Sequence, residues 1–472
     1  MTKLTVAKFG GSAIGPNGTS IPQIVLRIND LKKDSKVIAV FSAPMTIIDG
    51  KKRSLTDVII KQGQRAENGE SPSLDDVKAT YQKILEMVDS DNIESCKETV
   101  ELHLQKAQKA LDEALANKEF ADEIRSRALA FSGEILMSHV MNHILRSNGI
   151  KSDAVSFEDW PIITDNNIES TNFKVSESLE RIGKISELVE NNEVVSIGGF
   201  IGKTTDNVTT TYERGGSDRT AADLGILFHK KYQTSIDFEK DSSVVSADPK
   251  IVESGLTEVE HLSYNEARLA GMFGMKILDP IAIKEIVENG VDMPIKVTNM
   301  KDPTKTTTIK RVLDQQKGHP IKIVTGKENC AIFRIETSCI QRLLTSLEKD
   351  KRYSEFIILS PFTKDGVEFS RILFLDGDYV KRNEKYLLSF DSLATITYNR
   401  GVITLIGDQM WRVQQVASRT SAKVGLAGLN ILNMDAQEET SRIIIVVEDT
   451  DSNIRKAISA IHQEVPEINF IE

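Results

Sequence analysis

The sequence predicts an α/β protein in which a parallel sheet is followed by two smaller α+β modules. Apolar segments at residues 4–9 and 194–197 run directly into glycines, which is typical of strands that end at a ligand-binding turn. A helix expected at 21–32 separates the first of them from another apolar strand at 36–44, and this order makes a βαβ unit. Beyond residue 300, short elements repeat in the order strand, helix, strand, strand.

The chain of 472 residues is long enough for about three domains. The first is expected at 1–300, where a charged helical region at 74–145 packs one face on the sheet. Two ferredoxin-like modules follow, at 301–393 and 394–472. The elements expected in these modules are, in order, 330–335, 340–349, 356–359, 369–375, 401–407, 413–427, 429–434, 442–447 and 452–463.

Composition limits the partners and the compartment. The net charge of −10 argues against nucleic acid and anionic membranes as partners. The N-terminus has no signal-peptide pattern, and no apolar run approaches the length of a membrane span. Cys96, Cys330 and Cys339 show neither a disulfide framework nor metal-ligand spacing. We therefore expect a cytoplasmic protein that has no nucleic-acid or membrane partner and no metal ligands of its own.

A glycine motif, Arg214-Gly215-Gly216-Ser217-Asp218, stands between a strand and the helix that begins near residue 219. Backbone N–H groups at such a helix start attract anions, and the planar guanidinium of Arg214 suits a carboxylate or a phosphate. Asp218 falls in the first turn, where the helix dipole favours negative charge. On its own, this motif is more often a capped helix after a tight turn.

The second glycine motif, Lys8-Phe9-Gly10-Gly11-Ser12, ends the first strand. Its backbone N–H groups and the Lys8 ammonium together suit a phosphate, although the pattern is neither a P-loop nor a dinucleotide fingerprint. The two motifs lie far apart in the sequence and have the same chemistry. Their combination is much more specific than either motif alone.

Together the two motifs resemble those of the aspartate kinases in the amino-acid-kinase superfamily, whose N-terminal signature is Lys-Phe-Gly-Gly-Thr-Ser. Ser12 replaces the threonine and keeps its hydroxyl. The resemblance extends over the whole chain, and residues 401–463 are similar to the family's second ACT module. Other segments similar to family motifs are Val40-Phe41-Ser42-Ala43, Thr56-Asp57, Ser132-Gly133-Glu134, Ile163-Thr164-Asp165, Gly199-Phe200-Ile201-Gly202 and Phe273-Gly274-Met275-Lys276.

The resemblance implies an amino-acid-kinase-type parallel-sheet sandwich followed by two ACT modules. It also implies ATP-dependent phosphorylation of the L-aspartate side chain to 4-phospho-L-aspartate, the first step of lysine, threonine and methionine biosynthesis. Mg²⁺ would be carried by the nucleotide phosphates. The ACT modules imply a lysine or threonine effector and a homodimer or higher homo-oligomer. No dehydrogenase segment is recognised after these modules, so we expect a monofunctional kinase.

Residue roles follow from the same resemblance. Lys8 and Asp218 would be catalytic, with Asp218 orienting Lys8 rather than abstracting a proton. An aspartate side chain has an unperturbed pKa of about 3.9 and needs no general base at neutral pH. The aspartate-binding residues implied are Ser42, Thr56, Glu134, Arg214, Gly215, Gly216 and Ser217. The nucleotide-binding residues implied are Lys8, Gly10, Gly11, Ser12, Phe238, Glu239, Lys240, Val245, Lys250 and Lys276.

Departures from the family pattern gather at the nucleotide end. Phe238-Glu239-Lys240-Asp241 stands where the family has Trp-Thr-Asp-Val, Val245 replaces a tyrosine, and Lys250 replaces an arginine. Two alternatives therefore accompany aspartate kinase. One is a superfamily kinase for another acidic amino acid, and the other is a catalytically silent amino-acid sensor. Retention of Lys8 and Arg214 argues against the silent sensor.

Overall fold

The structure is a computed structural model, and the chain forms two compact units that are described separately here. Unit 1 combines Met1–Ser243 with Ile281–Arg311, and unit 2 combines Val244–Pro280 with Val312–Glu472. Unit 2 thus contains a segment that the sequence analysis assigned to the first domain. The residues described are 1–213, 215–275, 277–312, 319–350, 356–438, 440–450 and 453–468.

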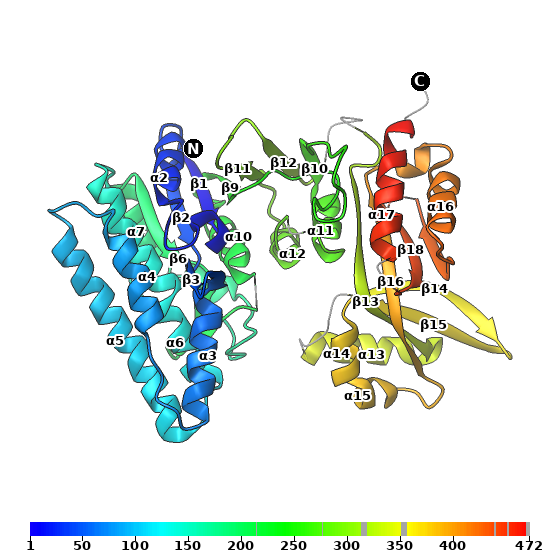
Figure 1. Ribbon diagram of the computed structural model, residues 1–472, viewed down its shortest axis with the longest axis horizontal. Helices are drawn as coiled ribbons and strands as arrows, with labels where there is room; N and C mark the ends of the chain where they lie inside the picture. The colour runs from blue at the N-terminus through cyan, green and yellow to red at the C-terminus, as the bar shows by residue number, and fades with distance from the viewer. Residues whose placement is uncertain are drawn as a thin grey trace. The chain divides into compact units, whose positions relative to one another are not determined.

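Unit 1 is built on a sheet whose strands lie in the order β12-β11-β9-β1-β2-β6-β5 (Figure 1). Neighbouring strands from β11 to β5 pair in parallel, and β12 pairs antiparallel with β11. This confirms the parallel sheet expected from the sequence. The strands are β1 (Lys3–Phe9), β2 (Lys36–Phe41), β5 (Ser152–Ala154), β6 (Val194–Gly198), β9 (Gln233–Lys240), β11 (Ile295–Asn299) and β12 (Thr306–Lys310).

The first strand of unit 1 buries most of its apolar side chains on both faces of the sheet. Leu4, Val6, Ala7 and Phe9 of β1 are all fully buried. A parallel strand covered by helices on both faces has no solvent-facing side, so its apolar residues do not alternate with polar ones. Helix α2 (Ile21–Leu31) covers one face of β1 and β9, and helix α10 (Gly216–Phe228) covers the other face. The two helices form ion pairs with side chains that project from opposite faces of these strands.

The rest of unit 1 is helical, with two hairpins. The charged region at 74–145 forms helices, as expected, and α5, α6 and α7 pack against one another. The helices are α1 (Gly11–Ile14), α3 (Leu55–Glu67), α4 (Asp75–Leu85), α5 (Ile93–Asn117), α6 (Asp122–Ser132), α7 (Glu134–Ser147), α8 (Val175–Leu179), α9 (Gly183–Asn191) and α12 (Pro280–Glu288). The hairpins are β3 (Met45–Ile48) with β4 (Lys51–Ser54), and β7 (Ile201–Lys203) with β8 (Thr209–Thr211).

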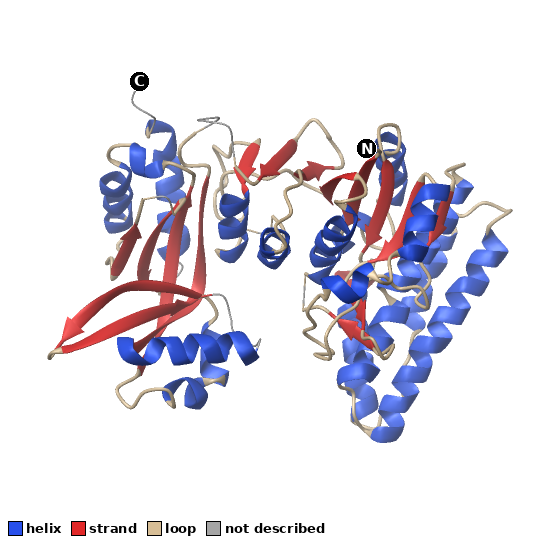
Figure 2. Ribbon diagram, turned by 180° about the vertical axis from the view of Figure 1, so that it is seen from behind, coloured by secondary structure: helices blue, strands red, loops and turns tan. Residues whose placement is uncertain are grey.

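Unit 2 contains one antiparallel sheet, in the order β14-β15-β13-β16-β18-β17. Its strands are drawn in red in Figure 2. The expected repeat of strand, helix, strand, strand occurs twice, but the two copies share this sheet. Strand β13 joins them, because it pairs with β16 along most of its length and its second half also pairs with β15 on its other edge, while β16 pairs with β18. The strands are β13 (Ile323–Glu336), β14 (Phe356–Lys364), β15 (Val367–Phe374), β16 (Thr395–Ile406), β17 (Asn433–Ala436) and β18 (Arg442–Glu448).

Each half of unit 2 has its own apolar core. One contains Phe333 and Phe374, and the other contains Leu405 and Ile445. Ala247 belongs to the second core, which explains why the segment from residue 244 is part of this unit. The remaining elements are β10 (His261–Ser263), α11 (Tyr264–Met272), α13 (Thr337–Asp350), α14 (Gly377–Arg382), α15 (Glu384–Leu388), η1 (Met410–Arg412), α16 (Val416–Leu426), α17 (Asn453–Glu464) and η2 (Val465–Glu467). Within the described ranges, none of the helices has both the length and the apolar character needed to cross a bilayer.

Candidate functional site

A cavity of about 340 Å³ in unit 1 collects most of the residues that the sequence predicted for a site. It lies where β1 and β2 end, since both strands run in the same direction and lead directly into lining residues. The lining residues are Lys8, Gly11, Ser12, Ser42, Ala43, Met45, Ser54, Thr56, Asp57, Glu134, Phe200, Gly215, Gly216 and Ser217. Two segments about 200 residues apart in the sequence therefore form one surface.

Lys8 and Asp218 form a buried ion pair at this cavity. The distance from Lys8 Nζ to Asp218 Oδ1 is 2.6 Å, and the two residues are 8% and 5% exposed. The Lys8 ammonium lies close to Gly10, where a Cβ atom would be only 3.2 Å from Lys8 Nζ. The ammonium is therefore held over the glycine turn by Asp218, as expected for a group that must meet a phosphate in a fixed position.

The turn before α10 needs its two glycines. Gly215 has a φ of 95°, a left-handed conformation that glycine adopts without strain. A Cβ on Gly216 would overlap the side chain of Tyr212. The next residue, Ser217, accepts a hydrogen bond of 2.9 Å from Ser42 Oγ, which joins this turn to the end of β2. The turn is thus fixed with the start of α10 facing the cavity.

Helices α3, α7 and α10 all begin at lining residues. Their N-termini carry partial positive charge, which favours anions in the cavity. At α3, Ser54 is the N-cap and accepts a hydrogen bond of 3.1 Å from the Thr56 N–H. Lys8 adds a full positive charge. The cavity therefore suits a ligand with more than one negative group.

Glu134 introduces a negative charge into the same cavity. It is 5% exposed, and burial raises the pKa of its carboxyl group to about 7, against the lowering effect of a backbone hydrogen bond from Ala43. No cationic side chain among the described residues pairs with it. A buried carboxylate without a cation favours a ligand that brings one, such as an α-ammonium group.

Tyr81 fixes the turn that carries Glu134, and no pattern in the sequence indicated this role. Its hydroxyl donates to the carbonyl oxygens of Ser132 and Gly133, at 3.2 and 3.1 Å. Burial and the nearby Glu134 raise the pKa of Tyr81 well above its usual value, so the hydroxyl stays a donor. Ser54, Met45 and Phe200 are other lining residues to which sequence reasoning assigned no role. Only Phe200 carried a signal, its place between two glycines.

The residues predicted for the nucleotide do not all lie in this region. Phe238 and Glu239 are buried, and Glu239 Oε1 accepts a hydrogen bond of 2.7 Å from Arg27 of α2, on the face of the sheet away from Lys8. The structure therefore does not support a role for Glu239 at the nucleotide. Val245 and Lys250 belong to unit 2. Arg214 and Lys276 lie outside the described residues.

A buried polar network packs behind the α10 turn. The hydroxyl of Tyr212 donates to Asp223 at 2.5 Å, and the guanidinium of Arg219 bonds to Glu285 of α12 at 2.6 Å and stacks on the Tyr212 ring. Burial raises the pKa of Asp223 well above its usual range, with Glu285 adding to this effect. This network ties the start of α10 to α12, and Tyr212 directly supports Gly216.

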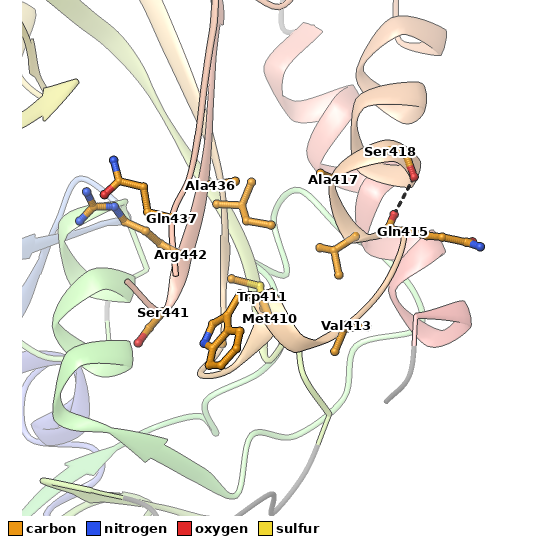
Figure 3. A pocket seen from close by; sticks show the side chains of 13 residues that line it. Met410, Trp411, Val413, Gln415, Ala417, Ser418, Ala436, Gln437, Ser441 and Arg442 are labelled. Atoms are coloured by element: carbon orange, nitrogen blue, oxygen red, sulfur yellow. Dashed lines mark hydrogen bonds between the residues drawn. The ribbon is translucent and has the colours of Figure 1, made fainter. Parts of the chain in front are cut away.

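Unit 2 contains a second cavity, of about 460 Å³, shown in Figure 3. The start of α16 borders it at Ala417 and Ser418, and Trp411 borders it on η1 with 44% of its surface exposed. Arg442 of β18 also lines it and lies 3.5 Å from the buried carboxylate of Asp435. The remaining lining residues are Gly407, Met410, Val413, Gln415, Val416, Ala436, Gln437, Ser441 and Ile443. An aromatic ring, a cation and a helix N-terminus suit a small amphipathic anion or zwitterion.

Comparison with known proteins identifies the family. A sequence model of the amino acid kinase family matches residues 3–299, which is more than half of the chain. The chain therefore belongs to the amino acid kinase family.

Individual relatives are distant. Bifunctional aspartokinase/homoserine dehydrogenase 2, chloroplastic, of Arabidopsis thaliana is 24% identical over 343 residues, which are 70% of this chain and 35% of that protein. Aspartokinase 1 of Bacillus subtilis is 25% identical over 329 residues, which are 68% of this chain and 72% of that protein. The chain spans between 35% and 42% of the length of three bifunctional relatives that it matches.

Two crystal structures of Escherichia coli aspartokinase III share the fold. The complex with aspartate and ADP has a TM-score of 0.77 at 17% identity, and the alignment covers 98% of this chain and 99% of that one. The complex with lysine and aspartate has a TM-score of 0.65 at 18% identity, with the same coverage. At these identities the likeness shows the fold alone. It confirms an amino-acid-kinase-type parallel-sheet domain followed by a domain with an antiparallel sheet.

Proposed function

We propose that this protein transfers the terminal phosphoryl group of ATP to the side-chain carboxylate of L-aspartate, giving 4-phospho-L-aspartate. The observation that carries the proposal is the cavity of unit 1, in which Lys8 and three helix N-termini provide for anions while Glu134 provides for a cation. Aspartate has two carboxylates and one ammonium, and this set of charges matches it. Names of aspartokinases among the relatives support the same reading.

The chemistry requires positioning and neutralisation of charge rather than proton abstraction. The attacking carboxylate is already ionised near neutral pH. Lys8 would meet the phosphoryl group during transfer, with Asp218 holding its ammonium in place. Ser42 and Thr56 would orient the reacting carboxylate, and Ser217 would present its backbone N–H group. Glu134 would bind the α-ammonium group.

ATP is expected to place its phosphates on the glycine turn of Gly10, Gly11 and Ser12. A Mg²⁺ ion supplies charge neutralisation on the phosphates when it is bound. Among the described residues there is no cluster of three or more His, Cys, Asp or Glu side chains that could hold a metal ion. The ion would therefore take most of its oxygen ligands from the nucleotide and from water.

Arg214 keeps the role that the family resemblance gives it, as the clamp on the α-carboxylate. Its position next to Gly215, which lines the cavity, supports this role. Arg214→Ala should weaken aspartate binding strongly, because a carboxylate would remain unpaired in a largely enclosed site. Aspartate saturation curves for the variant and the native protein test it, and unchanged saturation would mean that another cation binds this carboxylate.

The decisive assay measures ADP release with L-aspartate, L-glutamate and N-acetylglutamate, with hydroxylamine to trap the acyl phosphate. We expect turnover and hydroxamate with aspartate. Efficient turnover with either other substrate would support a kinase for a different acidic amino acid. No turnover with any substrate, together with retained amino-acid binding, would support the catalytically silent sensor.

We further propose that unit 2 binds an effector amino acid, lysine or threonine, in its 460 Å³ cavity. The effector carboxylate would meet the N–H groups at the start of α16 or the guanidinium of Arg442, and its aliphatic part would lie on Trp411 (Figure 3). Edge strands β14 and β17 support a further proposal, a homodimer through this unit, because exposed strand edges readily pair.

Trp411 offers a direct readout, since the chain's other tryptophan, Trp160, is 1% exposed. Addition of lysine or threonine to the full chain should change the Trp411 fluorescence and inhibit turnover in parallel. Trp411→Phe should remove the signal and keep most of the inhibition, whereas Arg442→Gln should weaken both. A monomeric protein indifferent to both amino acids would contradict the effector and the dimer proposals.

A further inference from the structure

Lys240 lies on the face of the sheet from which Lys8 projects. It stands in β9, two residues after the residue that pairs with Lys8. Strands β1 and β9 pair in parallel, with Lys8 opposite Phe238. Side chains alternate along a strand, so Lys240 projects from the same face as Phe238 and Lys8. Asp237 and Glu239 project from the other face, where both bond to Arg27. Lys240 therefore stands at the carboxyl end of β9, on the side where α10 begins.

The charges around Lys240 confirm this placement. Burial lowers the pKa of its ammonium group, the Asp218 carboxylate raises it, and the Lys8 ammonium lowers it again. Charges interact appreciably only over short distances, so Lys240 lies near both Asp218 and Lys8. Asp241 also raises this pKa, but it is exposed to water, which screens its charge.

Asp218 is bonded to Lys8, and Lys240 has no comparable partner. None of the described residues forms a hydrogen bond or ion pair with the Lys240 ammonium. A partly buried ammonium loses hydration and is normally compensated by an anion. A solvated surface lysine would not show the lowering by burial. The missing anion is therefore supplied by something that enters the site.

We propose that Lys240 is a second phosphate-binding cation of the transfer site, which contacts the nucleotide polyphosphate on the side away from the amino acid. This inference rests on the proposed kinase function. Two ammonium groups beside one carboxylate leave an excess positive charge, and a polyphosphate is the substrate group with enough negative charge to use it. Lys240 stands where the resembled family has an aspartate, so this chain has changed the sign of the charge at that position.

The test measures ADP binding by calorimetry on the full chain, with and without Mg²⁺ and without aspartate. Lys240→Met should weaken ADP binding roughly tenfold or more, since a charge-assisted hydrogen bond is lost. Lys240→Arg keeps the charge and should bind within about threefold of the native protein. The matched control is Lys230→Met, because Lys230 is exposed just before the other end of β9. It should leave ADP binding unchanged.

The outcomes separate this inference from the proposed function. Native protein that binds ADP through Lys240 but phosphorylates no amino acid would support the inference and contradict the kinase function. ADP affinity that is the same in Lys240→Met as in the native protein would overturn the inference. If Lys240→Met does not fold, Lys240→Gln replaces it, and tripolyphosphate serves as a probe without a base. Native protein that binds neither ADP nor tripolyphosphate would also overturn it.

Discussion

Two charged clusters lie on opposite faces of β1 and β9, and they differ in the partners that the protein provides for their charged groups. On the α2 face, Arg27 bonds to Asp237 at 3.2 Å and to Glu239 at 2.7 Å, and both carboxylates are buried. On the α10 face, Lys8 bonds to Asp218 at 2.6 Å beside a cavity, and Lys240 has no bonded partner among the described residues. In the first cluster, one cation of the protein bonds to both carboxylates, whereas the second cluster leaves positive charge for a ligand.

The comparison also holds for single buried carboxyl groups. Burial and the neighbouring Asp237 carboxylate raise the pKa of Glu239 to about 8 although Arg27 opposes the shift, and burial raises that of Glu134, which pairs with no cation among the described residues, to about 7. Mutations in the cluster on the α2 face should therefore lower the stability of the protein. Mutations in the cluster on the α10 face should instead change ligand binding and turnover. The following predictions test this distinction, beginning with the largest effect.

Lys8→Ala should lower kcat by about a hundredfold to a thousandfold and change the aspartate KM much less. Its charge matters most in the transition state, as for other electrostatic groups that act on developing charge. Steady-state kinetics with saturating Mg-ATP measure this. Lys3→Ala, an exposed lysine at the start of the same strand, is the control and should behave as the native protein. Near-native kcat in Lys8→Ala would remove Lys8 from the mechanism.

Arg27→Met should lower the free energy of unfolding by about 3 kcal/mol, because two buried carboxylates lose their only bonded cation. Kinetic constants of the folded protein should stay close to native. Urea unfolding measures the effect, with Lys33→Met as the control. Lys33 forms an exposed pair with Asp30, whose loss should not be measurable. A loss of kcat without a loss of stability would show that the two faces are not independent.

The aspartate KM should rise roughly tenfold as the pH falls from about 8 to about 6, because a free-enzyme group with a pKa of about 7 becomes protonated over this range. The sign follows from the charge: the ionised Glu134 attracts the substrate ammonium, and the neutral form favoured below its pKa does not. Glu134→Gln should bind aspartate weakly and show a nearly flat profile. A native profile that is flat between these pH values would exclude Glu134 as the ammonium ligand.

The smallest expected effect is a modest preference for ATP over GTP. Strong selection requires donors and acceptors matched to one base edge. Of the residues predicted to bind the nucleotide, Glu239 bonds to Arg27 and Phe238 is a core residue, so neither presents such a group. Catalytic efficiencies with ATP, GTP and ITP at saturating aspartate measure the preference. A ratio above roughly a thousand would indicate a purine pocket built from other residues.

Unit 2 is built from two separate segments of the chain, and this limits which variants can test regulation. Judged from the sequence alone, truncation after residue 300 is the obvious way to remove the regulatory modules. In the structure this would leave the segment Val244–Pro280 without the core to which Ala247 and Val252 belong. Single substitutions such as Arg442→Gln in the full chain avoid this damage and are the better experiment.

The sequence by itself determined the chemistry and the order of elements. Lys8, Ser42, Glu134 and Gly215 could be assigned to one site because the short motifs that carry them resemble family motifs, and such motifs are encoded over a few residues. The parallel sheet and the two repeats in unit 2 could be predicted for the same reason, since hydrophobic periodicity is a local property.

The tertiary structure decided which partners those residues meet. Alternation along β9 separates Glu239 from Lys240, but only the placement of α2 and α10 shows which of the two faces the site. Tyr81 reaches the turn before Glu134 from another helix, and the shared strand β13 joins two modules that look separate in sequence. These facts depend on contacts between residues far apart in the chain, and local propensity and periodicity carry no information about such pairings.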